Sequence, residues 1–222
     1  MLNVKRLAFT LAEVLIVIGI IGIVAEMVIP GVVADTQKQI TVAKVKEVYS
    51  ILSQATNQIN LNCSGAIINC LTNPNAPLDD VPTSIELTNL YKQKLYVVKD
   101  CTDGSTTGCF ANVTYKVLKG TNYINLVTYA GFTNSRIVLK NGIAVEFEWG
   151  GLGNAISVLV DVNNEKPPNQ MGKDTFYFIN YTGGTAYTPN VLLPFPNNDC
   201  VTTNGGFGCS AKILQESAIN YY

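Results

Sequence analysis

The chain contains no histidine among its 222 residues. This absence removes the commonest general base, the commonest zinc ligand and every nucleophile pair of the Ser-His or Cys-His type. Charge is also scarce, because only 14% of the residues are charged, against about 25% in ordinary soluble domains. A chain with so little charge needs a membrane or many protein neighbours. The composition therefore predicts a protein that is not an enzyme.

The chain also has no excess of basic over acidic residues. The formal net charge is -1, so the chain lacks the positive field that neutralises phosphates, and no nucleic acid is expected as a partner. It also lacks a phosphate loop, a nucleotide fingerprint and a metal-protease helix. Its length suits one globular domain plus an extended element, because single domains usually contain about 100–200 residues.

The six cysteines all lie beyond residue 62 and form three couples close in sequence: Cys63 with Cys70, Cys101 with Cys109, and Cys200 with Cys209. An even number in loop-like surroundings indicates disulfides made in an oxidising compartment. Many other connectivities are possible, so local pairing is a preference. Zinc is the weaker alternative, because structural zinc sites favour closer cysteine spacing and no histidine is present to complete a mixed site.

Residues 14–33 form an almost wholly apolar run, which is long enough to cross a membrane. Lys5 and Arg6 precede the run and none of its own residues is basic, which places the N-terminus on the cytoplasmic side. The rest of the chain then lies outside the cytoplasm, in agreement with the cysteines.

An ordinary signal peptide, cleaved after the apolar run at Ala25 or Ala34, is the alternative interpretation. Two carboxylates argue against it, Glu13 at the start of the run and Glu26 inside it. A carboxylate inside a membrane is costly, so it indicates a function such as pairing with an assembly partner. For Glu26 no partner is identified.

Residues Ala8 to Leu15 read Ala-Phe-Thr-Leu-Ala-Glu-Val-Leu. This stretch resembles the prepilin cleavage motif of type IV pilins and type II secretion pseudopilins, with Ala8 in place of the family's usual glycine. The resemblance implies cleavage between Ala8 and Phe9 by a prepilin peptidase, and methylation of the new amino group on Phe9. It also implies a bacterial inner-membrane protein that passes to an assembly platform and joins other subunits in a pseudopilus or a surface pilus.

Two further residues match the family in the same register. Glu13 takes the place of a nearly universal glutamate, and Pro30 lies where pilin helices commonly kink. The chemistry supports a role for Glu13 independently, because the amine of Phe9 and the Glu13 carboxylate of a neighbouring copy could neutralise each other in an apolar medium. Pro30 and Gly31 are expected to kink the helix or to melt it locally.

From residue 35 to about residue 60 the helical pattern becomes amphipathic. An apolar stripe along it consists of Thr41, Val45, Val48, Leu52, Ala55 and Ile59. The stripe is expected to pack on the protein's own sheet, because it is too short for a coiled coil.

Segments of β type dominate the remainder, at residues 95–99, 113–118, 123–129, 137–139, 143–149, 156–162 and 175–179, after a possible short helix at 83–94. Asn141 and Gly142 predict a two-residue hairpin, because both turn residues can take positive φ. The pattern predicts an α+β fold with an antiparallel sheet, and the pilin resemblance implies that the long N-terminal helix lies against that sheet.

Four regions are therefore expected: a leader peptide at residues 1–8, a transmembrane and assembly half of the helix at 9–34, an amphipathic half at 35–62, and a globular sheet domain at 63–222. Within the last region, a disulfide is expected to staple the loop between Cys200 and Cys209, and residues 210–222 could dock back on the domain through Ile213, Leu214 and Ile219.

The stretch from Asp161 to Asp174 is a candidate calcium loop. It lacks the glycine and the glutamate of an EF-hand, yet it is similar to an Asp-Val-Asn-Gly stretch of pilin-like proteins, and some pseudopilins bind calcium in a C-terminal loop. The ligands would be Asp161, Asn163 and Asp174. The alternative is an Asx-rich turn whose side chains bond to its own backbone.

A structural subunit is the leading functional hypothesis, and a minor tip subunit that acts as an adhesin is the nearest rival. A tethered enzyme is the third. Its acid pair would be Glu146 with Glu148, or Asp161 with Glu165, as in glycoside hydrolysis. Alternation places Glu146 and Glu148 on one face of a strand, where exposure to solvent is the simpler expectation.

Overall fold

The computed structural model describes residues 10–77, 79–105, 107–125, 135–150, 155–181, 190–196 and 198–222. The chain divides into two compact units, Met1–Ile40 and Thr41–Tyr222. Helix α1 (Leu11–Asn62) contributes to both units. Each unit is described by itself.

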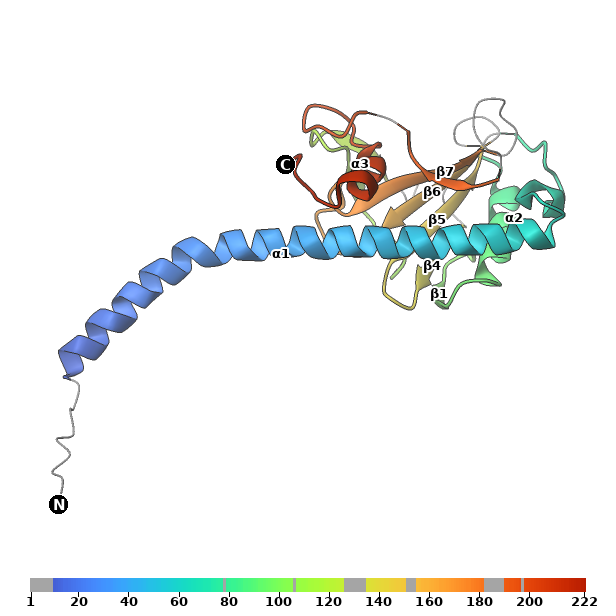
Figure 1. The fold of residues 1–222 in the computed structure, drawn as a ribbon. Coiled ribbons are helices and arrows are strands. Elements are labelled where there is room, and N and C mark those ends of the chain that lie inside the picture. Colours follow the sequence, from blue (N-terminus) through green and yellow to red (C-terminus); the bar gives the residue numbers. More distant parts are fainter. Residues whose placement is uncertain are drawn as a thin grey trace, which may run out of the picture. The chain divides into compact units, whose positions relative to one another are not determined.

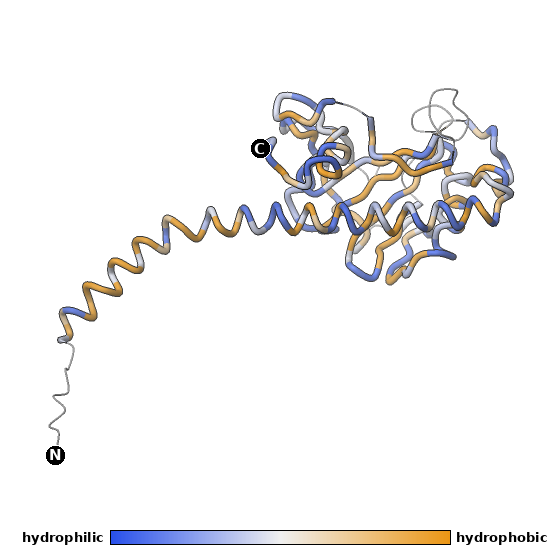
Figure 2. The backbone as a smooth tube through the Cα atoms, in the orientation of Figure 1, coloured by the Kyte–Doolittle hydropathy of each residue, from blue (hydrophilic) through white to orange (hydrophobic). Residues whose placement is uncertain are grey.

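The first unit consists, where it is described, of the N-terminal part of α1 up to Ile40. Its large apolar side chains are exposed, from Leu11 to Ile40, and Figure 2 shows mostly hydrophobic colour along the first turns of the helix, before the polar residues 35–39. The α-helix continues through Pro30, so local melting, one of the two expected alternatives, does not occur. The stretch is drawn as a curved, unbroken helix (Figure 1).

The second unit is built on an antiparallel sheet with the strand order β1-β4-β5-β6-β7-β8. Its strands are β1 (Val97–Asp100), β4 (Arg136–Leu139), β5 (Ala144–Trp149), β6 (Ala155–Asp161), β7 (Thr175–Tyr181) and β8 (Leu192–Pro194). A separate hairpin consists of β2 (Thr114–Lys116) and β3 (Asn122–Asn125). The expected α+β class and antiparallel sheet are confirmed. Part of the strand expected at 123–129 lies outside the described residues.

The part of α1 in the second unit packs on one face of the sheet (Figure 1). The predicted stripe is confirmed, because Val45, Val48, Leu52, Ala55 and Ile59 are buried, although Val42 rather than Thr41 begins it. The inward side chains of β4 to β7 meet this stripe, including Ile137, Phe147, Val158 and Phe178.

Helix α2 (Val81–Lys92) starts earlier than the predicted helix, because the Asp80 side chain caps it by accepting a hydrogen bond from Thr83 N at 3.0 Å. The helix also packs into the same core. The ring of Tyr91 stacks on Phe147 with 4.1 Å between centroids. The hydroxyl of Tyr91 lies 2.7 Å from that of Thr56 on α1.

The β4–β5 hairpin forms where Asn141 and Gly142 predicted it, but with a different turn. Gly142 N donates to Leu139 O at 2.8 Å, and Gly142 has φ of 79°, whereas Asn141 is not among the residues with positive φ. The turn is therefore of the type in which a single glycine in the left-handed region follows two ordinary residues. Residues 140–142 connect the strands, since Leu139 N donates to Ile143 O at 2.9 Å, so the expectation of a two-residue turn was wrong.

Three disulfides, Cys63–Cys70, Cys101–Cys109 and Cys200–Cys209, confirm the local pairing. The first staples the 3-10 helix η1 (Ile67–Cys70) to the end of α1, and the third staples the start of helix α3 (Cys209–Glu216). The expected docking of the C-terminal stretch is seen, because Ile213 and Ile219 are buried and the Tyr221 hydroxyl donates to Gly172 O at 2.6 Å.

The second face of the sheet carries its own apolar cluster, formed around Phe110, Tyr115, Leu159 and Met171. The Cys101–Cys109 disulfide belongs to this cluster. Because both faces are covered, residues that point away from α1 are also buried.

Candidate functional site

The start of α1 holds the described part of the predicted processing and assembly site. Thr10 N and Thr10 Oγ1 both donate to Glu13 Oε2, at 2.8 and 2.9 Å, and Glu13 N donates to Thr10 Oγ1 at 3.2 Å. This reciprocal arrangement is a capping box, which satisfies backbone donors that a helix start leaves open. Ala8 and Phe9 lie outside the described residues.

The apolar run that follows is long and apolar enough to cross a membrane, by length and composition. Glu26 is exposed on it, among exposed apolar neighbours such as Met27 and Ile23. Neither Glu26 nor Pro30 breaks the helix.

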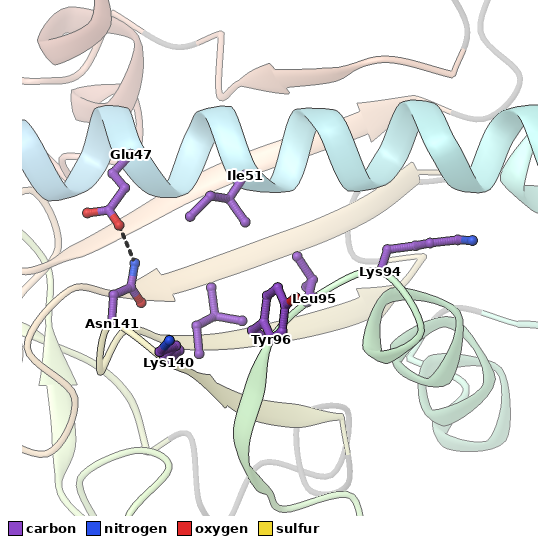
Figure 3. Close-up of a pocket in the computed structure, with 8 residues that line it drawn as sticks. Glu47, Ile51, Lys94, Leu95, Tyr96, Lys140 and Asn141 are labelled. Atoms are coloured by element: carbon purple, nitrogen blue, oxygen red, sulfur yellow. Dashed lines mark hydrogen bonds between the residues drawn. The ribbon is translucent and has the colours of Figure 1, made fainter.

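A groove of about 450 Å³ lies in the second unit beside α1. Its apolar lining is formed by Ile51, Leu95, Tyr96 and Leu139, and its polar lining by Glu47, Lys94, Lys140 and Asn141. Figure 3 shows Asn141 bridging to the helix, where its Nδ2 donates to Glu47 Oε1 at 3.0 Å. The groove could hold an apolar side chain.

The candidate calcium residues lie around one loop, which is exposed at residues 165–168 and buried at residues 169–172. Asp161 Oδ1 accepts from Asn163 N at 3.0 Å, and Asp161 Oδ2 accepts from the Tyr115 hydroxyl at 2.9 Å. Asn163 Nδ2 donates to Pro167 O at 3.2 Å. The bond from Asp161 to the backbone two residues later is an Asx turn, as the alternative interpretation predicted.

Asp174 closes the same loop. Its two carboxylate oxygens accept from Asn169 N and Gln170 N, both at 2.7 Å. Burial, together with the nearby Asp174 carboxyl, raises the pKa of Asp161 well above its ordinary value, and burial also raises the pKa of Asp174. Among the described residues, no group of three or more His, Cys, Asp or Glu side chains could hold a metal ion.

Glu146 and Glu148 do share one face of β5, but the expectation that solvent covers this face was wrong. Their residues are 1% and 3% exposed. Arg136 lies directly opposite Glu146 in the β4–β5 register. Ser135 Oγ donates to Glu146 Oε1 at 3.1 Å, and the Tyr177 hydroxyl lies 3.5 Å from Glu148 Oε2.

Burial and the neighbouring Glu148 carboxyl raise the pKa of Glu146 well above its ordinary value, and Arg136 only partly opposes this. Burial, followed by contact with the Asp79 carboxyl, raises the pKa of Glu148 to about 8. Raised carboxyl pKa values are common at catalytic sites, but these two carboxyls are closed to a substrate. In the other proposed pair, Asp161 and Glu165, the Glu165 carboxylate accepts a hydrogen bond from Gly108 N through Oε1.

Sequence reasoning missed Arg136, Asp79 and Tyr177 as partners of these glutamates. A signal for Arg136 was available, since the hairpin at residues 140–142 places it opposite Glu146. Asp79 and Tyr177 are far apart in sequence from β5, and only the fold brings them there.

Comparison of the chain with protein-family models, with curated proteins and with solved structures found no match.

Proposed function

We propose that the chain is a structural subunit of a type IV pilus or a type II secretion pseudopilus. In this proposal, prepilin peptidase cuts between Ala8 and Phe9 and the new amino group is methylated. Residues 9–34 hold the subunit in the inner membrane with its N-terminus in the cytoplasm, and an assembly platform then joins copies of the chain through α1.

The observation that carries the proposal is the first unit of α1. Its apolar side chains are exposed along the whole stretch, for example Leu15, Ile18 and Val28 at 55%, 56% and 52%. A helix that is hydrophobic all round needs a membrane or other helices to cover it. In the proposed life cycle the bilayer covers it first and neighbouring copies cover it afterwards.

The second unit supports a membrane topology in which the globular part lies outside the cytoplasm. Its three disulfides suit an oxidising compartment, which lies beyond the inner membrane. The buried position of Glu146 and Glu148 gives no support to a tethered hydrolase, so the proposal assigns the chain no catalytic step.

The test is the N-terminal residue of the mature protein, read by peptide mass spectrometry on chain purified from the cell envelope. The expected result is a methylated Phe9. An N-terminus at Glu26 or Asp35 would show that an ordinary signal peptide had been removed and would overturn the proposal. An intact Met1 would show that no peptidase acts on the chain, with the same consequence.

A further inference from the structure

Glu26 is the only charged residue among residues 14–33. Its side chain is exposed on the described helix, and so are those of Ile23 and Ile29, at 59% and 56%. These isoleucines lie three residues before and after Glu26, so the three side chains share one face of α1. A carboxylate is costly in apolar surroundings unless a cation accompanies it. The surface that covers this face must therefore combine apolar side chains with a cation.

The groove beside α1 in the second unit has this combination. Its apolar lining includes Tyr96, which is 86% exposed. Its charged lining consists of Lys94, Lys140 and Glu47, so ammonium groups outnumber carboxylates by one. One further carboxylate, brought in by an apolar partner, would balance the charge of the groove.

Lys140 is the cation best placed to meet an entering carboxylate. Its backbone N donates to Tyr96 O at 2.9 Å, which holds it at the groove, and its side chain is exposed. Among the described residues the ion pairs are formed by other lysines, Lys92 and Lys212. In Figure 3, Lys140 lies beside Asn141, whereas the Lys94 side chain extends away from the groove. Glu47 is itself engaged by Asn141.

A second copy of the chain must supply the carboxylate. Glu26 and Glu47 lie on one continuous helix, α1, and at 1.5 Å per residue about 30 Å of helix separates them. Because Glu47 lines the groove, the Glu26 that enters it belongs to another copy. The two contacting surfaces differ, so the contact is heterologous, and its repetition builds a ring or an open filament rather than a two-fold dimer.

We propose that the groove around Tyr96 and Lys140 receives the first-unit helix of a second copy, with Glu26 of that copy paired to Lys140. The inference rests on the proposed function and adds to it the surface through which copies recognise one another. Ile23 and Ile29 of the entering helix cover the apolar lining, in the manner of a helix bound in a groove. The carboxylate that the apolar run carries is thereby neutralised when neighbouring copies replace the bilayer.

A cycle of neutral variants tests the pairing through the fraction of subunit found in sheared filaments. Lys140→Met leaves Glu26 in the groove without its cation, and we expect the fraction to fall about tenfold. Combining it with Glu26→Gln removes the unpaired carboxylate and should recover most of the loss. Glu26→Gln alone should lose less than Lys140→Met, because the exposed lysine can stay hydrated.

Lys119→Met is the matched control. Lys119 is an exposed lysine between β2 and β3, where its backbone N donates to Asn204 O at 2.9 Å. The variant loses the same charge outside the groove and should assemble like the unaltered chain.

Cross-linking of filaments of the unaltered chain locates the contact directly. A carbodiimide joins a carboxylate to an ammonium group that touches it, through an amide and with no spacer. We expect a covalent dimer on a denaturing gel, in which mass spectrometry finds the peptide of Glu26 joined to that of Lys140.

The proposal is overturned if the dimer lacks this amide, if Lys140→Met assembles like Lys119→Met, or if the double variant assembles no better than Lys140→Met. If Lys140→Met does not fold by circular dichroism, the cross-link in the unaltered chain decides alone. The N-terminal residue separates this failure from failure of the proposed function. Any of these results with a methylated Phe9 strikes only the groove contact, whereas an unaltered chain without methylated Phe9 strikes both.

Discussion

Thr10 and Glu13 cap the first turn of α1 reciprocally, with Thr10 N donating to Glu13 Oε2 at 2.8 Å and Glu13 N donating to Thr10 Oγ1 at 3.2 Å. The carboxylate proposed to pair with a neighbouring subunit therefore also has a local structural role. The two roles make different demands, because a cap needs an oxygen acceptor and pairing with an amine needs a charge.

Glu13→Gln separates the two roles. Glutamine can complete a capping box but carries no charge, so we expect recruitment into filaments to fall by about tenfold or more, as for an uncompensated charge that costs several kcal/mol. Glu13→Val removes cap and charge together and should abolish recruitment. The measurement is the fraction of subunit found in sheared filaments relative to the membrane pool.

Thr10→Ala is the matched control, because it weakens the cap and keeps the carboxylate. We expect it to assemble nearly as well as the unaltered chain. Normal assembly of Glu13→Gln together with failure of Thr10→Ala would assign Glu13 to the helix start and refute its role in pairing.

Tyr91→Phe should lower the free energy of unfolding by about 1 kcal/mol, the usual net contribution of one hydrogen bond. The variant loses the contact of the Tyr91 hydroxyl with Thr56, while Thr56 keeps its bond to Leu52 O at 2.8 Å. Tyr96→Phe, at a residue that is 86% exposed, serves as the control and should change nothing. Urea unfolding of the full chain in detergent measures the unfolding free energy of both variants. Equal changes in the two variants would show that the Tyr91 hydroxyl makes no stabilising hydrogen bond with Thr56.

Asp161 should make the protein more stable in acid than at neutral pH. Burial raises its pKa well above 3.8, so the folded state favours the protonated carboxyl. The resulting stabilisation is complete below 3.8 and is lost as the pH rises through the folded-state value, at about 1.4 kcal/mol per pH unit while only the folded state holds the proton.

Asp161→Asn should therefore lose less unfolding free energy than the unaltered chain between acid and neutral pH. Urea unfolding at several pH values measures this difference. Asp103→Asn is a suitable control, since the exposed Asp103 has a pKa lowered by its bonds to Ser105. An unchanged slope in Asp161→Asn would show that its carboxyl ionises alike in the folded and unfolded chain.

Calcium is expected to leave the melting temperature unchanged at millimolar concentration. Asp161 and Asp174 already direct their carboxylate oxygens at backbone amides and at Tyr115, so a cation would have to displace these bonds. Differential scanning fluorimetry of the full chain measures this, with magnesium as the control. A rise of more than about 2 °C that calcium alone produces, and that Asp161→Asn removes, would establish the metal site instead.

Features with a local origin could be predicted from the sequence. The apolar run, the stripe from Val45 to Ile59 and the pairing of cysteines seven to nine residues apart all depend on neighbours along the chain. Strand β8 and helix α3 were not predicted. Both elements are short. Strand β8 contains Pro194, and helix α3 begins after Gly208, which supplies no side-chain cap. Packing rather than local propensity therefore selects these two elements.

The sequence by itself thus determined a long apolar helix, an amphipathic continuation and an antiparallel α+β unit with locally paired cysteines, because helical and strand periodicity and short loop closure act over a few residues. Only the tertiary structure decided that Glu146 and Glu148 are buried and that Asp79 meets Glu148. Alternation assigns a side chain to one face of a strand, but what covers that face comes from segments distant in the chain.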